Sequence, residues 1–266
     1  MDRVTSKDGT SIAYDRQGRG PAVILVGGGL DDGAENAPLV PRLAAWCTVY
    51  NYARRGRAGS GDTPPYAVER EIEDLAALIA EAGGKAHLYG ASSGGALALE
   101  GTAAGLPVDR LAVYEVPYLV DGDMVERWRD YVERLGPTLA DGRRGDAVAL
   151  FMRTAGASEE MVASARSLPV WPGLEAIAHT LAYDAACIGD GRPPVERLAT
   201  IARPTLVATG GASPDSFVGG GGAFFDSAAD AIAASVPNAR RQTFEGQGHV
   251  ADPDVVAPLL ERFFAG

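Results

Sequence analysis

The segment Gly90-Ala91-Ser92-Ser93-Gly94-Gly95 follows a strand-like run, residues 86–89, and precedes a helix-like stretch of small residues, 96–104. It contains the pattern Gly-x-Ser-x-Gly at a strand-to-helix turn. A serine on such a sharp turn is held in strained backbone geometry, and the flanking glycines let the chain approach itself closely. The segment therefore predicts a serine hydroxyl exposed at one end of a sheet. A glycine turn that only packs a helix on a strand is the alternative, unless Ser92 has partners.

Strand-like and helix-like segments alternate on both sides of this turn. The expected strands are residues 4–6, 11–16, 22–26, 47–52, 86–89, 111–114, 205–209 and 241–244. The expected helices are residues 38–45, 68–82, 96–104, 123–135, 144–154, 158–167, 174–188, 224–235 and 255–264. This alternation predicts an α/β protein with a mostly parallel central sheet and flanking helices.

The alternation stops between residues 118 and 198, where the segments look helical and aromatic residues concentrate. We expect residues 1–117 and 199–266 to form one core domain, with residues 118–198 as a helical cap inserted after the sixth strand. Asp123 and Ser158 are the expected N-caps of two cap helices.

The composition restricts the partners. The chain has 266 residues and a formal charge of −11, with no large basic cluster, so nucleic acids and anionic membranes are not expected partners. Its two cysteines, Cys47 and Cys187, have no metal-binding spacing, and the first residues lack the apolar core of a signal peptide. We expect a cytoplasmic protein without metal or cofactor that acts on a small molecule; a homodimer stays open.

A nucleophilic serine needs a base, an orienting acid and an oxyanion hole. Of the three histidines, His249 follows the last expected strand, at the same end of the sheet as Ser92, and is the predicted base. His87 lies within the strand before Ser92 and is expected to be structural. His179 lies in the expected cap, where it is a candidate pocket residue.

Two carboxylates are candidates for the acid. Glu115 directly follows the apolar strand 111–114, where an unpaired charge would be costly, so a histidine would be a suitable partner. Asp215 lies in the loop after strand 205–209, which is the usual place of the acid, but two residues beyond the customary position, Ser213. We favour Glu115 and keep Asp215 as the alternative acid.

The oxyanion hole should consist of two backbone N–H groups. One belongs to Ser93, the residue after Ser92. The other lies in the loop after strand 22–26, at Gly29 or Leu30, and we favour Gly29. A tight turn is the alternative role of the glycines at 27–29. Residues 90–95 and 27–33 both lack the motifs of nucleotide-binding loops.

These residues resemble the α/β-hydrolase superfamily over essentially the whole chain, because Ser92, Glu115 and His249 follow its serine–acid–histidine order. One loop resembles the Tyr-Asp-Arg-Arg-Gly-Arg-Gly-Asp-Ser-Gly-Asp of cofactor-free actinobacterial hydrolases. Here it reads Tyr52-Ala53-Arg54-Arg55-Gly56-Arg57-Ala58-Gly59-Ser60-Gly61-Asp62. It departs at Ala53 and around Ala58, and Ala91 stands where that group commonly has histidine.

A second resemblance is to zearalenone-type lactone hydrolases. That family shares a Gly-x-Ser-Ser-Gly turn, a Gly-Leu oxyanion turn and a Glu-x-Pro after the sixth strand. The similar segments here are Ser92-Ser93, Gly29-Leu30 and Glu115-Val116-Pro117. The resemblance implies Glu115 as the acid and Trp171 as a tryptophan that helps to hold the substrate.

Together these features predict a serine hydrolase of esters or lactones, with a largely apolar, aromatic or macrocyclic substrate. The predicted substrate contacts are Leu30, Trp128, Trp171, His179 and Tyr183. Simple helix packing explains the cap aromatics equally well. The alternatives are the same fold carrying out cofactor-free lyase or cyclase chemistry, and a ligand-binding protein without catalysis.

Overall fold

The computed structural model describes residues 1–211 and 222–266, whose eight strands form one sheet in the order β1-β2-β4-β3-β5-β6-β7-β8. The strands are β1 (Asp2–Thr5), β2 (Ser11–Gly18), β3 (Ala22–Val26), β4 (Thr48–Tyr52), β5 (Ala86–Ala91), β6 (Val108–Tyr114), β7 (Thr205–Thr209) and β8 (Ala239–Thr243). The pairs β1–β2 and β2–β4 are antiparallel, and all other neighbours are parallel. The predicted mostly parallel sheet is confirmed.

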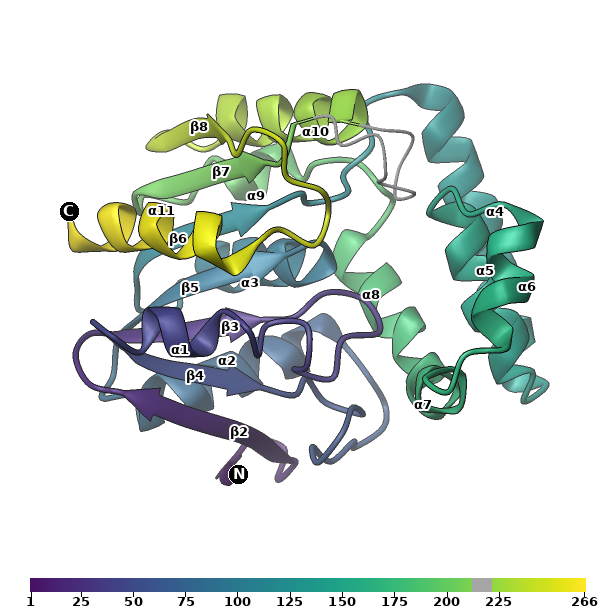
Figure 1. Cartoon of the computed structure of the whole chain (residues 1–266), viewed down its shortest axis with the longest axis horizontal. Coiled ribbons are helices and arrows are strands. Elements are labelled where there is room, and N and C mark those ends of the chain that lie inside the picture. Colours follow the sequence, from purple (N-terminus) through teal and green to yellow (C-terminus); the bar gives the residue numbers. More distant parts are fainter. Residues whose placement is uncertain (212–221) are drawn as a thin grey trace.

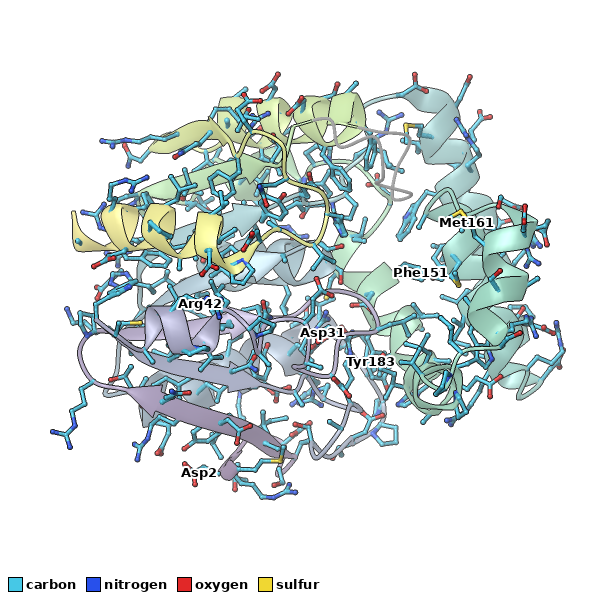
Figure 2. The ribbon with its side chains drawn as sticks, viewed as in Figure 1. Asp2, Asp31, Arg42, Phe151, Met161 and Tyr183 are labelled. Atoms are coloured by element: carbon cyan, nitrogen blue, oxygen red, sulfur yellow. The ribbon has the colours of Figure 1, made fainter. Side chains whose placement is uncertain are left out.

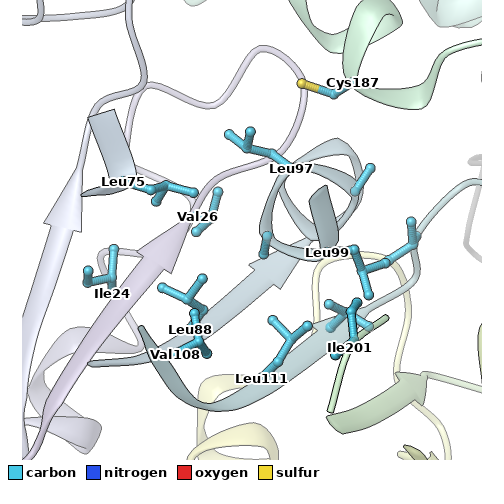
Figure 3. Close-up of a cluster of buried hydrophobic side chains, with 14 of the residues drawn as sticks. Ile24, Val26, Leu75, Leu88, Leu97, Leu99, Val108, Leu111, Cys187 and Ile201 are labelled. Atoms are coloured by element: carbon cyan, nitrogen blue, oxygen red, sulfur yellow. The ribbon is translucent and has the colours of Figure 1, made fainter. Parts of the chain in front are cut away.

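Helices cover both faces of the sheet (Figure 1). They are α1 (Val40–Leu43), α2 (Val68–Glu81), α3 (Ser93–Ala103), α10 (Gly222–Ser235) and α11 (Pro253–Ala265). On one face, side chains of α2 and α3 such as Leu75 and Leu97 pack on Val26 and Leu88 (Figure 3). On the other face, α1 and α11 form a second core. The central strands are continuous apolar runs because both of their faces are buried.

Between β6 and β7 the chain forms helices only, which we call the insertion (Figure 1). They are α4 (Gly122–Ala140), α5 (Arg144–Thr154), α6 (Glu159–Arg166), α7 (Trp171–Ile177), the short 3₁₀ turn η1 (Ala178–Thr180), α8 (Leu181–Ile188) and α9 (Val195–Leu198). The insertion has its own apolar clusters, and α8 and α9 also contact α3 of the core. Within the described residues, no helix combines the length and apolarity needed to cross a membrane.

Two local expectations for the insertion are wrong. The N-cap of α4 is Asp121, not Asp123, because the Asp121 carboxylate accepts from the Asp123 N–H at 2.8 Å. The expected helix over residues 174–188 is divided at η1, where the Thr180 hydroxyl donates to the Ile177 carbonyl at 2.7 Å. The apolar spacing of the sequence reveals neither the capping side chain nor the change to 3₁₀ geometry. Ser158 caps α6 as predicted.

Candidate active site

Ser92 is the single residue between β5 and α3, and its backbone angles are strained, with φ 54° and ψ −130°. Such a conformation costs on the order of 1–3 kcal/mol and persists only where its surroundings impose it. The Ser92 N–H donates to the Tyr114 carbonyl and its carbonyl accepts from the Gly95 N–H, both at 2.9 Å. A Cβ at Gly90 would lie 2.6 Å from the Gly94 carbonyl oxygen. The turn therefore requires glycine there, and it presents a half-buried serine at the end of β5.

His249 lies on the loop between β8 and α11, and its ring contacts Glu115. The His249 Nδ1 lies 2.7 Å from the Glu115 Oε2. An ionised carboxylate can only accept, so the shared proton belongs on Nδ1 and the Nε2 of a neutral ring is left as an acceptor. These two residues, 134 positions apart in the chain, are thus brought together as a hydrogen-bonded pair.

The surroundings of Glu115 fix its carboxylate. Glu115 directly follows β6, has a left-handed φ of 47°, and its N–H donates to the Ala208 carbonyl at 3.0 Å. Its side chain is only 4% exposed, and Oε1 accepts from the Gly210 N–H at 3.0 Å. Both carboxylate oxygens therefore have partners, as a buried charge requires. The alternative acid, Asp215, lies outside the described residues.

The His249 ring is also held from its face. Phe225 of α10 stacks on it with a centroid separation of 5.0 Å and an interplanar angle of 17°. The Tyr114 hydroxyl donates to the Gly248 carbonyl at 2.6 Å, which holds the loop next to His249. A cavity of about 70 Å³ adjoins the ring, with Glu35 and Tyr89 among its lining residues. The cavity is large enough for a few water molecules beside the imidazole.

The loop after β3 passes directly beside Ser92. A Cβ at Gly28 would lie 3.0 Å from the Ser92 Cβ, and Leu30 has a left-handed φ of 58°. Ser93 is the first residue of α3, so its N–H has no acceptor in a preceding helical turn. The loop that carries Gly29 and the start of α3 are thus next to the serine.

A buried group of charged side chains, absent from the sequence predictions, lies behind this loop. We call it the arginine cluster: Arg54, Arg57, Glu71 and Asp184. Arg54 donates to both Glu71 oxygens at 2.7 Å and to the Asp184 Oδ1 at 2.6 Å. Arg57 donates to both Asp184 oxygens at 2.8 Å. The two guanidinium and two carboxylate groups balance in charge, and none of the four side chains is more than 5% exposed.

Opposite charges keep the carboxylates of the arginine cluster ionised. Burial by itself raises the pKa of Asp184, but the Arg57 and Arg54 charges and a hydrogen bond from Ser93 outweigh it, so this pKa lies below its ordinary value. In the same way, burial raises the pKa of Glu71, but the Arg54 charge and hydrogen bonds lower it overall. One feature of the sequence could have indicated the cluster: Asp184 is the only charged residue of α8, which is otherwise apolar apart from Tyr183.

The two tryptophans predicted to contact substrate make hydrogen bonds within the insertion. Trp171 is 5% exposed, packs in an insertion cluster, and its Nε1 donates to the Glu175 carboxylate at 2.8 Å. Trp128 is half-buried, and its Nε1 donates to the Gly189 carbonyl at 3.0 Å. Packing and hydrogen bonding thus account for both side chains as the structure places them.

His179, Tyr183 and Leu30 lie where the insertion meets the core. The Tyr183 hydroxyl donates to Asp62 at 2.7 Å, and the His179 Nε2 lies 3.4 Å from the same carboxylate oxygen. Leu30 packs against an insertion cluster against which Phe151 also packs. In Figure 2, Phe151 and Tyr183 lie on the side of the insertion that faces the loop bearing Asp31.

A family profile described as the alpha/beta hydrolase family matches residues 22–259. The chain belongs to the alpha/beta hydrolase family, and the fold expected from the sequence is confirmed.

Individual relatives match nearly the whole chain. A pimeloyl-[acyl-carrier protein] methyl ester esterase of Xanthomonas campestris pv. campestris is 32% identical over 264 residues, covering 93% of this chain and 96% of the relative. The crystal structure of an alpha/beta hydrolase from Sphaerobacter thermophilus has 51% identity and a TM-score of 0.88, covering 99% of this chain and 100% of that one. A hydrolase structure from Pseudomonas aeruginosa, with 22% identity and a TM-score of 0.74 over 100% of this chain and 98% of its own, shares the fold.

Proposed function

We propose that this protein is a serine hydrolase that cleaves carboxylic esters or lactones. In this proposal Ser92 is the nucleophile, His249 the base and Glu115 the orienting acid. The observation that carries the proposal is the 2.7 Å contact between His249 and Glu115, which belong to the same end of the sheet as the strained turn at Ser92. A serine on such a turn, with a histidine held by a buried carboxylate, is suited to acyl transfer.

The proposed mechanism uses the hydrogen-bonded His249 ring to transfer protons. The His249 Nε2 accepts the proton of the Ser92 hydroxyl while Oγ attacks the ester carbonyl carbon. The imidazolium, stabilised by Glu115, then donates that proton to the leaving alkoxide, and an acyl-enzyme remains. A water molecule, deprotonated by His249, attacks the acyl carbonyl and releases the acid and Ser92. The cavity beside His249 is one route by which water can reach the ring.

The negatively charged oxygen of each tetrahedral intermediate needs hydrogen-bond donors to stabilise it. The N–H of Ser93, at the positive end of α3, and the N–H of Gly29 are the proposed pair. Each donor of this kind contributes about 3 kcal/mol to transition-state stabilisation.

The proposed substrate is a small, largely apolar ester or lactone bound between the core and the insertion, which acts as the cap. Leu30, which packs near Phe151, supplies apolar surface at this position. The Xanthomonas relative, named as a methyl ester esterase, supports an ester substrate. The similarity to zearalenone-type enzymes, which rests on short motifs, supports a lactone as the other form, and His179, Tyr183, Trp128 and Trp171 remain proposed contacts. A cytoplasmic location is part of the same proposal.

Replacement of Ser92 by alanine tests the proposal. Wild-type protein should hydrolyse p-nitrophenyl butyrate and should be labelled at Ser92 by a fluorophosphonate probe, as peptide mass spectrometry will show. The Ser92→Ala variant should lose both reactions. Ser227→Ala, which changes an exposed serine of α10, is the matched control and should retain both. Ester turnover that persists in the Ser92→Ala protein would disprove the assignment.

A further inference from the structure

The arginine cluster lies directly behind the proposed oxyanion hole and bonds to the backbone that forms it. Arg57 donates through Nη1 to the Gly28 carbonyl and, at 3.1 Å, to the Asp31 carbonyl. Arg54 donates to the Gly27 carbonyl at 3.3 Å. Three carbonyl groups of the loop after β3 are therefore held by two guanidinium groups that cannot lose their charge.

The contact with Gly28 fixes the direction of one particular N–H group. The Gly28 carbonyl and the Gly29 N–H belong to the same peptide unit, which is planar and trans, so they point in opposite directions. When Arg57 holds the carbonyl on the buried side, the Gly29 N–H must point away from Arg57. Arg57 Nη2 donates to both Asp184 oxygens at 2.8 Å, which fixes the Arg57 guanidinium in turn.

The same carboxylate also holds the residue that carries the second amide. The Ser93 hydroxyl donates to the Asp184 Oδ1 at 2.8 Å. A Cβ at Gly29 would lie 3.6 Å from the Asp184 Oδ2, so this loop is also next to the carboxylate. Asp184 comes from α8, an insertion helix that packs on α3.

We propose that Asp184 and Arg57 are positioning residues that hold the Gly29 and Ser93 amides at the distance an oxyanion requires. This inference rests on the proposed serine hydrolase function. Neither side chain touches the reacting atoms; each acts through a neighbour, Arg57 through the Gly28 peptide unit and Asp184 through Arg57 and Ser93. One carboxylate of the insertion therefore sets the geometry of a site formed by backbone groups of the core.

The test compares Ser93→Ala and Asp184→Asn with wild type. Because the oxyanion develops only in the transition state, displaced amides should lower kcat and leave KM within about twofold. We expect kcat on p-nitrophenyl butyrate to fall roughly 10- to 100-fold in Asp184→Asn and about 3- to 10-fold in Ser93→Ala. The rate of Ser92 labelling by the fluorophosphonate should fall in parallel.

Glu100→Gln is the matched control. Glu100 is a buried carboxylate of α3 that pairs with Arg197 of α9 at 2.7 Å, so its loss also removes an ion pair between core and insertion, but away from the loop after β3. Its kcat should equal that of wild type. Circular dichroism at the assay temperature shows whether each variant is folded. If Asp184→Asn does not fold, Ser93→Ala decides, because it removes no charge.

The outcomes separate this inference from the proposed function. If wild type turns over the ester and is labelled, but the folded variants keep its kcat, the positioning inference is wrong and the serine mechanism stands. A change in KM alone also overturns the inference. If wild type neither hydrolyses the ester nor is labelled at Ser92, both proposals fail.

Discussion

Two sets of polar side chains lie at the end of the sheet that carries Ser92, and they differ in their acid–base chemistry. In the first, a histidine whose side chain is 17% exposed contacts one buried carboxylate, Glu115. In the second, the arginine cluster, four ionised groups are almost completely buried. An imidazole ring can both accept and donate a proton, whereas a guanidinium group keeps its charge. The first set is therefore suited to moving protons, and the second to holding the backbone in place.

The change with the greatest effect on kcat should be one in the pair of His249 and Glu115. Glu115→Gln should lower kcat by roughly a thousandfold or more, because an amide does not stabilise the imidazolium and can hold the wrong tautomer of His249. Asp215→Asn should retain wild-type kcat. Steady-state kinetics on a p-nitrophenyl ester will check both. If activity is lost only in Asp215→Asn, the choice of Glu115 is wrong.

The next largest effect should be a loss of stability when the arginine cluster is changed. Glu71→Gln leaves two buried guanidinium groups with one carboxylate, Asp184. An uncompensated buried charge of this kind typically costs about 3–5 kcal/mol in the free energy of unfolding. Equilibrium unfolding in urea, followed by circular dichroism, measures this difference.

Glu100→Gln serves as the comparison for that measurement. Its partner Arg197 has a 65% exposed side chain, so no buried cation is left behind when the carboxylate is removed. Burial raises the pKa of Glu100 despite the Arg197 charge, so folding disfavours its ionised form. The free energy of unfolding should fall by less than about 1 kcal/mol. Equal losses in the two variants would show that the arginine cluster has no special role in stability.

The stability that the arginine cluster contributes should also depend on pH. The pKa values of Glu71 and Asp184 are lowered in the folded protein, with Arg54 and Arg57 overcoming the effect of burial. The unfolded chain therefore binds protons more readily. The stability from these groups is complete above their ordinary pKa values, 4.5 and 3.8, and is lost as the pH falls through the lower folded values. The difference in unfolding free energy between wild type and Glu71→Gln should shrink from pH 7 to pH 3. A constant difference would contradict this.

The smallest expected effect concerns the ring that covers His249. Phe225→Leu removes an aromatic stack that is typically worth about 0.5–1.5 kcal/mol, so kcat should fall about two- to tenfold. Phe263→Leu on α11, whose ring packs on Phe264 rather than on His249, should leave kcat unchanged. A wild-type kcat in Phe225→Leu would show that Glu115 alone orients the imidazole.

The features predictable from the sequence are those set by local pattern. The apolar run of β3 and the Gly-x-Ser-x-Gly turn at Ser92 follow from neighbouring residues and strand or turn geometry. The order of elements then places the loop of His249 at the same end of the sheet as Glu115, so their pairing could be expected, although the triad itself stays a proposal. The break at η1 could not be predicted, since two consecutive helices have the same periodicity as one.

The arginine cluster could not be predicted because its members come from separate segments. Arg54 and Arg57 appear in the sequence as a basic glycine-rich loop, which is typical of an exposed surface. Their burial depends on two acids far away in the chain, Glu71 and Asp184. Likewise, the Phe225 stack on His249 depends on how α10 lies beside the loop after β8. No local pattern specifies such contacts.

The position of Asp184 on α8 has a consequence for the modularity of this fold. By chain order α8 belongs to the insertion, yet its carboxylate completes the arginine cluster of the core. A recombinant enzyme that exchanges the insertion for that of another family member to change substrate range should therefore exchange residues 122–177 and leave α8 in place. The functional boundary between the exchangeable segment and the catalytic scaffold then falls at η1 and not at the end of the helical segment.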